Sequence, residues 1–138
     1  MNQYKFQGDV ILAEIFSEIL FSYLKPFTKT HVITTIPASA ASYQNRGFKP
    51  VDLLLKYANI PHTPILKHVK STKPQSSKTR SERLQADQPF AVISPKELAN
   101  LKMSILIVDD VYTTGRTIYH ARELLEETVA TASVSLFR

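Results

Sequence analysis

The sequence predicts an α/β fold with a mainly parallel, twisted sheet flanked by helices on both faces. Helix-like and strand-like segments alternate along its 138 residues, which is the pattern of parallel sheets joined by crossover helices. Ile105–Val108 is a run of four apolar residues, typical of a central parallel strand buried on both faces. We expect one domain over residues 1–138, with an entry helix region over 1–30 and an α/β core over 31–138 that includes a mobile basic loop at 67–83.

The first half of the chain is expected to hold a helix, a strand and a second helix. Asp9–Leu24 is apolar on all but a narrow side, which predicts a helix largely buried against something else and ending before Lys25-Pro26. His31–Ile36 is rich in β-branched residues and stops at Pro37, as a strand does. A helix around Val51–Ala58 follows.

The second half repeats this alternation around the polar segment 67–83. Ser94 precedes Pro95 with Glu97 two residues further, the pattern of an N-cap with proline at the first helical position. The expected elements are, in order, a short strand near Ile65-Leu66, a strand at Phe90–Ile93, a helix from Ser94, the strand Ile105–Val108, a helix from Gly115 to Glu127 with Ile118, Ala121, Leu124 and Leu125 on one side, and a strand at Ala132–Phe137.

Composition excludes several classes of site. The chain has no Cys, so it has no disulfide, thiolate nucleophile or cysteine-ligated zinc or iron–sulfur centre. Its four His lack the short spacings of a metal-binding motif, which argues against a metal cage built by the protein alone. Val10–Leu24 is interrupted by Glu14 and Glu18 and lacks a basic leader, so we expect neither a membrane span nor a signal peptide, and a cytoplasmic location.

The excess positive charge is concentrated in segment 67–83. This segment carries a net charge of +5, equal to that of the whole chain, so the remainder is neutral. Its charged residues are Lys67, Lys70, Lys73, Lys78, Arg80 and Arg83 against Glu82. Three interpretations stay open: an ordinary solvated loop, a lid that closes over a phosphorylated ligand, and a surface that follows a DNA backbone.

Residues 105–117 carry the strongest chemical signal, since a buried strand runs directly into two acids, a hydroxyl-rich turn and a helix start. Asp109 and Asp110 suit vicinal hydroxyls, or a divalent cation shared with a ligand. The turn offers Thr113, Thr114 and Thr117 hydroxyls and Gly115, and the helix that follows directs free N–H groups at the same point. A sugar phosphate fits both parts; the alternative is a plain strand–turn–helix with Asp and Thr as caps.

This segment resembles the phosphoribosyl-pyrophosphate (PRPP) motif of type I phosphoribosyltransferases. Within that superfamily the chain is most similar to the competence protein F family (ComF, ComFC), which takes part in DNA uptake during natural transformation. Matching elements occur in the family's order along the chain: Tyr4–Asp9, Ile36-Pro37, Arg46–Phe48, then Thr72, Gln75 and Arg83 in the basic loop.

The resemblance implies a type I phosphoribosyltransferase-like fold and a set of residue roles. Asp109 and Asp110 would hold the ribose hydroxyls, and Thr113, Thr114, Gly115, Arg116 and Thr117 the 5′-phosphate. The turn of Pro37, Ala38 and Ser39 would take the pyrophosphate, with Mg²⁺ bound through the ligand and the two acids. Lys70, Lys73, Gln75, Lys78, Arg80 and Arg83 would contact pyrophosphate or DNA, and Arg46 would contact a phosphate or anchor a helix. Implied partners are PRPP, single-stranded DNA, other competence proteins such as a DNA-uptake helicase, and further copies of the chain.

The chain departs from the family in three places. Lys49-Pro50 stands where the family has Asn-Gln, and no Asn follows Arg83 within Leu84–Ala86. The family also opens with a four-cysteine zinc module that a chain without Cys cannot form, so we expect a truncated, divergent or separately encoded transferase-like domain. Two functions therefore stay open: an active phosphoribosyltransferase with an unidentified acceptor, and a non-catalytic competence factor that binds single-stranded DNA and retains the ligand site.

Overall fold

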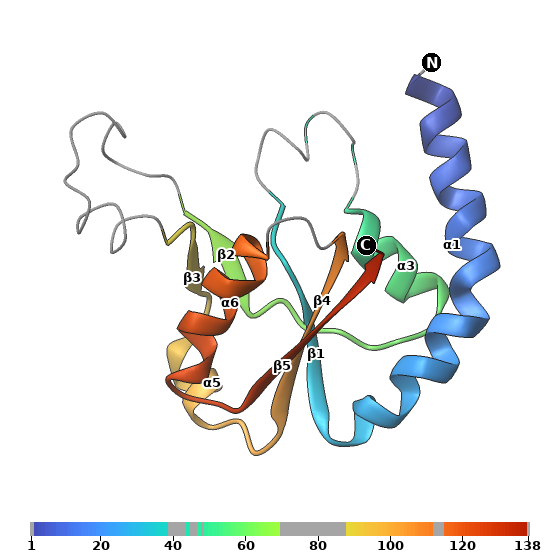
Figure 1. The fold of residues 1–138 in the computed structure, drawn as a ribbon. Coiled ribbons are helices and arrows are strands. Elements are labelled where there is room, and N and C mark those ends of the chain that lie inside the picture. Colours follow the sequence, from blue (N-terminus) through green and yellow to red (C-terminus); the bar gives the residue numbers. More distant parts are fainter. Residues whose placement is uncertain are drawn as a thin grey trace, which may run out of the picture.

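A three-stranded parallel sheet forms the centre of the computed structural model, which describes residues 2–38, 44, 47, 49–69, 88–111 and 115–137. Its strands are β1 (His31–Thr35), β4 (Ser104–Val111) and β5 (Thr131–Phe137), in the order β1-β4-β5. A separate antiparallel pair is formed by β2 (Leu66–His68) and β3 (Phe90–Val92). The predicted α/β fold with a mainly parallel sheet is confirmed (Figure 1).

Helices cover both faces of this sheet. Successive side chains of β4 point to opposite faces, and the apolar ones on each face form a separate core with the helices there. Leu106 and Val108 pack with the helices α1 and α3, whereas Ile105 and Ile107 pack with α5 and α6. The helical elements are α1 (Asn2–Leu24), the 3-10 helix η1 (Lys25–Lys29), α3 (Pro50–Tyr57), α5 (Pro95–Ala99) and α6 (Arg116–Glu126). These four side chains of β4 are each at most 3% exposed, so Ile105–Val108 is the buried central strand segment that the sequence predicts.

Prolines mark the starts of three helical elements. Each of η1, α3 and α5 has a Pro in its first two positions, where the missing N–H has no intrahelical partner to lose. The expected start of α5 is confirmed, but the Ser94 side chain makes no capping hydrogen bond. Pro26 ends the α-helix as predicted, yet the chain continues as η1, because proline is tolerated in the first turn of a new helix.

The sequence-based account of α1 is wrong in two respects. The helix starts at Asn2, seven residues before the predicted Asp9. It is also not largely buried: Leu20 and Leu24 lie in the core, but Ile15 and Ile19 are each more than 60% exposed. The physical reason is that α1 is apolar on most sides, whereas its neighbours α3 and η1 cover one side only.

Smaller differences concern the ends of the short strands. Strand β2 begins at Leu66 and extends to His68, so it includes the first two residues of the segment predicted as a basic loop. Residues 70–83 of that segment lie outside the described residues, and the single-domain division of the chain stays a prediction. Within the described residues, no helix is both long and apolar enough to cross a membrane.

We predict that Leu125→Ala destabilises the fold strongly. Leu125 of α6 is fully buried in the core formed with Ile105 and Ile107, so truncation leaves a cavity costing about 2–5 kcal/mol of unfolding free energy. Urea denaturation measures this loss. The control is Leu124→Ala, a change of the same type at the adjacent, partly buried position, where we expect a smaller effect. Equal losses for the two variants would contradict the packing described here.

Candidate functional site

Asp109 and Asp110 lie at the carboxyl end of the central strand, as the sequence predicts. In the parallel register Thr35, the last residue of β1, pairs with Val108, and Asp109 pairs with Ser135 of β5. The chain therefore leaves β1 through Ile36 and Pro37 beside the two acids. Both carboxyl side chains are half-buried. In open α/β sheets, ligands bind at this edge.

The first turns of two helices meet the same edge of the sheet. Figure 1 shows the start of α6 and the start of α3 at the end of the molecule where β1 and β4 finish. Gly115 precedes α6 with φ of +72°, a left-handed conformation that favours glycine. Unpaired main-chain N–H groups of a first turn and the positive end of the helix dipole attract anions, so this edge suits a phosphorylated ligand.

Burial perturbs the ionisation of Asp109. Loss of hydration raises its pKa from the usual 3.8 to about 6, and the charge of the adjacent Asp110 adds to the increase. The Asp110 main-chain N–H acts in the opposite direction, since it donates to Asp109 Oδ1 over 2.9 Å. Ionised Asp109 is therefore held in unfavourable surroundings, which hydroxyl donors or a divalent cation at this point would relieve.

A second polar cluster, which the sequence analysis missed, lies where β1 meets α3. The Thr35 hydroxyl donates to Asp52 Oδ1 over 2.7 Å, and this carboxylate also lies 3.7 Å from His62 Nε2 and 3.9 Å from Lys49 Nζ. Asp52 is in the first turn of α3. The cluster ties the end of β1 to α3 across seventeen residues of sequence. A first-turn Asp and a strand Thr are ordinary in sequence, so only the tertiary fold reveals the contact.

The remaining predicted site residues are only partly placed. Pro37 and Ala38 follow β1 and are half-buried, and Arg116 and Thr117 are exposed in the first turn of α6. The other predicted residues lie outside the described part of the chain: Ser39, Arg46, Lys70, Lys73, Gln75, Lys78, Arg80, Arg83, Thr113 and Thr114.

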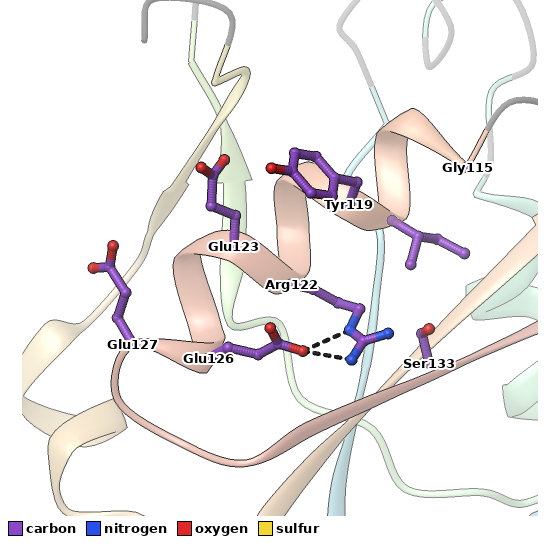
Figure 2. Close-up of a pocket in the computed structure, with 8 residues that line it drawn as sticks. Gly115, Tyr119, Arg122, Glu123, Glu126, Glu127 and Ser133 are labelled. Carbon is purple, nitrogen blue, oxygen red and sulfur yellow. Dashed lines mark hydrogen bonds and ion pairs between the residues drawn. The ribbon is translucent and has the colours of Figure 1, made fainter. Parts of the chain in front are cut away.

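A hollow of about 620 Å³ adjoins Gly115 along α6 and β5 (Figure 2). Its lining includes Glu123, Glu126 and Glu127, and its Arg122 is held by Glu126 at 2.6 Å. Because this lining is predominantly acidic, it does not suit a phosphate.

The described residues contain no group of three or more His, Asp or Glu that could hold a metal ion. A divalent cation beside Asp109 and Asp110 would therefore complete its coordination with oxygens of the ligand and water. Such a shared arrangement is the usual mode of Mg²⁺ at phosphorylated substrates, and carboxylate oxygens are suitable ligands for it. The donor set of this edge thus fits a cation that arrives with its ligand.

Two curated proteins match this chain over almost its whole length. It is 38% identical over 126 residues to competence protein ComFC of Streptococcus pneumoniae. This alignment covers 91% of this chain and 55% of that protein. It is 31% identical to competence protein ComFC of Bacillus subtilis, over 99% of this chain and 56% of that protein. The chain is a relative of ComFC. The predicted resemblance is confirmed, and the chain spans about half the length of the curated relatives it matches. No family model matches it.

Solved structures identify the fold of this ComFC relative as that of phosphoribosyltransferases. A hypoxanthine phosphoribosyltransferase from Staphylococcus aureus superposes with a TM-score of 0.52 over 94% of this chain and 62% of that one, at 13% identity. A purine phosphoribosyltransferase from Pyrococcus horikoshii superposes with a TM-score of 0.50 over 95% of this chain and 73% of that one, at 20% identity. The predicted type I phosphoribosyltransferase-like fold is thereby confirmed.

We predict that Asp109→Asn raises the melting temperature of the unliganded protein at pH 7.5. The pKa of Asp109 is raised on folding, so the folded state takes up its proton first and gains stability as pH falls from about 6 towards 4. Above that window the ionised carboxylate is a cost that Asn removes, while its Oδ1 still accepts from the Asp110 N–H. The gain should be a few degrees at pH 7.5 and should shrink at pH 5 in thermal melts.

The matched control for this measurement is Glu123→Gln, which removes a carboxylate that is 52% exposed on α6. Its melting temperature should stay close to that of the parent at both pH values. A lower melting temperature for Asp109→Asn at pH 7.5 would show that the ionised carboxylate stabilises the unliganded fold, contrary to the assignment.

Proposed function

We propose that this chain is the PRPP-binding domain of a ComFC-type competence protein and that it supports DNA uptake in the cytoplasm. One observation carries the proposal: a half-buried acid pair at the end of the central strand lies next to a glycine-led helix start. The similarity to ComFC indicates the biological context, and the phosphoribosyltransferase fold supplies the precedent for the site.

The acid pair and the start of α6 bind different parts of PRPP in this proposal. Asp109 and Asp110 accept hydrogen bonds from the ribose 2′- and 3′-hydroxyls, since ionised carboxylates are pure acceptors. The α6 start, with Gly115 and Thr117, donates main-chain and hydroxyl groups to the 5′-phosphate. The pyrophosphate then lies towards Pro37 and Ala38, next to the first turn of α3 and the Thr35–Asp52 hydrogen bond.

In its enzymatic form this site transfers the phosphoribosyl group to an acceptor. The bond between ribose C1 and the pyrophosphate oxygen breaks, positive charge develops on the sugar, and the departing pyrophosphate carries away the electron pair. Asp109 and Asp110 fix the ribose so that C1 faces the incoming acceptor, which lowers the entropic part of the barrier. Mg²⁺ bound with PRPP would supply charge neutralisation on the pyrophosphate. The side chains at this edge position the substrate and stabilise charge.

We predict that PRPP with Mg²⁺ raises the melting temperature of the protein. Ligand binding to the folded state alone stabilises it by about 2.7 kcal/mol when free ligand exceeds its dissociation constant a hundredfold. The double variant Asp109→Ala, Asp110→Ala should lose the shift, because it lacks the ribose acceptors. Differential scanning fluorimetry gives the shift and calorimetry the affinity.

The matched control replaces two acids of the Figure 2 hollow, Glu123 and Glu127, by Ala and should keep the full shift. If the parent protein shows no shift with PRPP and Mg²⁺, the site assignment fails. If the control variant loses the shift as well, the ligand occupies the acidic hollow instead.

The alternative function is a non-catalytic factor that binds single-stranded DNA and retains the ligand site. The concentration of the whole net charge in residues 67–83 favours it, since a basic segment can follow a nucleic-acid backbone. A pyrophosphate-release assay with and without single-stranded DNA distinguishes the two: release identifies the enzyme, and DNA binding without release identifies the binding factor.

We predict that replacing Lys70, Lys73, Lys78 and Arg80 together by Gln weakens single-stranded DNA binding. Each lost phosphate contact lowers the salt dependence, so the slope of log K against log salt should flatten by about 3 for four contacts. Fluorescence anisotropy over a salt series measures this slope. A control with Lys25, Lys56, Lys96 and Lys102 changed to Gln carries the same loss of charge on described surface positions and should keep the parent slope. An unchanged slope in the loop variant would place the DNA contact elsewhere.

A further inference from the structure

Helix α1 carries a row of exposed apolar side chains, which we call the α1 ridge: Ile11, Ile15, Ile19 and Tyr23. Each is between 54% and 63% exposed, although the same helix buries Leu20 and Leu24 in the core. Residues four apart lie above one another on a helix, so the four side chains form one continuous row. Five of the eight large hydrophobic side chains that are exposed among the described residues lie on α1.

A groove lies beside this ridge on the same surface. It has a volume of about 420 Å³ and is lined by Ser17, Glu18, Phe21 and Ser22 of α1 and by Tyr57, Ala58 and Asn59 at the end of α3 and just after it. Phe21 and Tyr57 supply its apolar walls and are 37% and 40% exposed. Ridge and groove therefore adjoin along the second half of α1.

We propose that two copies of the chain pair through the α1 ridge about a twofold axis near Ile19. In a twofold interface each copy presents the same surface, so the ridge of one copy packs against the ridge of the other, and the groove of each copy flanks this contact. Rows of residues four apart pack against each other at a crossing angle of about −50°, the commonest helix-pair geometry. In this pairing Ile19 meets its own counterpart and Ile15 meets Tyr23 of the second copy.

Area and charge both favour a second copy as the occupant. At roughly 100 Å² for each half-exposed large side chain, the ridge and Phe21 offer about 500 Å² per copy, so a pair buries about 1,000 Å² in total, which lies at the low end of the range for biological interfaces. An axis near Ile19 also brings the exposed Glu14 of one copy close to the exposed Lys25 of the other, a complementary pair at the rim. Lys25 already lies over the Phe21 ring, 4.9 Å from its centroid, at the edge of the groove.

Sedimentation of the full chain over a concentration series tests the pairing. We expect a dimer that the double variant Ile15→Glu, Ile19→Glu weakens at least tenfold, without loss of helix content, because both side chains are exposed in the single chain. The control Ile93→Glu introduces one glutamate at a position that is 48% exposed outside α1, and should remain dimeric, whereas Ile19→Glu alone, with the same change of charge, should already weaken the dimer. A parent chain that stays monomeric throughout, or a double variant that dimerises as well as the parent, overturns the proposal.

Cross-linking tests the position of the axis, since the natural chain has no Cys. Ile19→Cys should form a disulfide-linked dimer on mild oxidation, because the residue at a twofold axis meets its own copy. Tyr119→Cys on α6 is the matched control, since Tyr119 and Ile19 are both 63% exposed. Equal cross-linking of the two variants would show random collision and overturn the assignment. Binding of PRPP does not enter either experiment, so the result is independent of the proposed function.

Discussion

The complete burial of β4 is the constraint on which the rest of the structure depends. The strand pairs with β1 on one side and with β5 on the other, and it has an apolar core on each face, so Ile105, Ile107 and Val108 are fully buried. An ionisable side chain can therefore enter this strand only where it leaves the core. Asp109 and Asp110 occupy the first such positions and are half-buried, and this burial raises the pKa of Asp109. The pair lies where it does because of the sheet, before any ligand is considered.

Parallel pairing then gathers the rest of the site around these acids. Because β1 runs in the same direction as β4, its own exit lies at the same edge, and the helices that follow both strands begin there. An edge that collects two helix starts has a positive field, which opposes the charge of the acids. The combination suits a ligand with hydroxyls at one end and phosphates at the other better than a simple anion. The Thr35–Asp52 hydrogen bond fixes α3 relative to β1, so the two halves of the edge keep their spacing.

Sequence reasoning located what depends on local pattern and missed what depends on tertiary contacts. Four apolar residues followed by two acids defined β4 and its polar end, and Gly115 marked the start of α6, where the structure has a positive φ. The Thr35–Asp52 contact was not predictable, since neither residue type is unusual at its position. The burial of α1 was predicted wrongly for a related reason: composition shows that a helix has apolar surface on many sides, but only the packed structure shows which side its own chain covers.

The exposed side of α1 and the buried end of β4 are two outcomes of the same rule. Apolar surface is costly in water at roughly 25 cal/mol per Å², so covering the α1 ridge would stabilise the protein. A charge in the interior is retained only where something compensates it, as Asp109 requires above pH 6. Both features are unfavourable in the isolated chain, and their chemistry indicates what would compensate each of them. Apolar helix surface would cover α1, and hydroxyl donors with a cation would stabilise ionised Asp109. The two sites occupy different elements, so the proposed dimer face would leave the edge with Asp109 open to its proposed ligand.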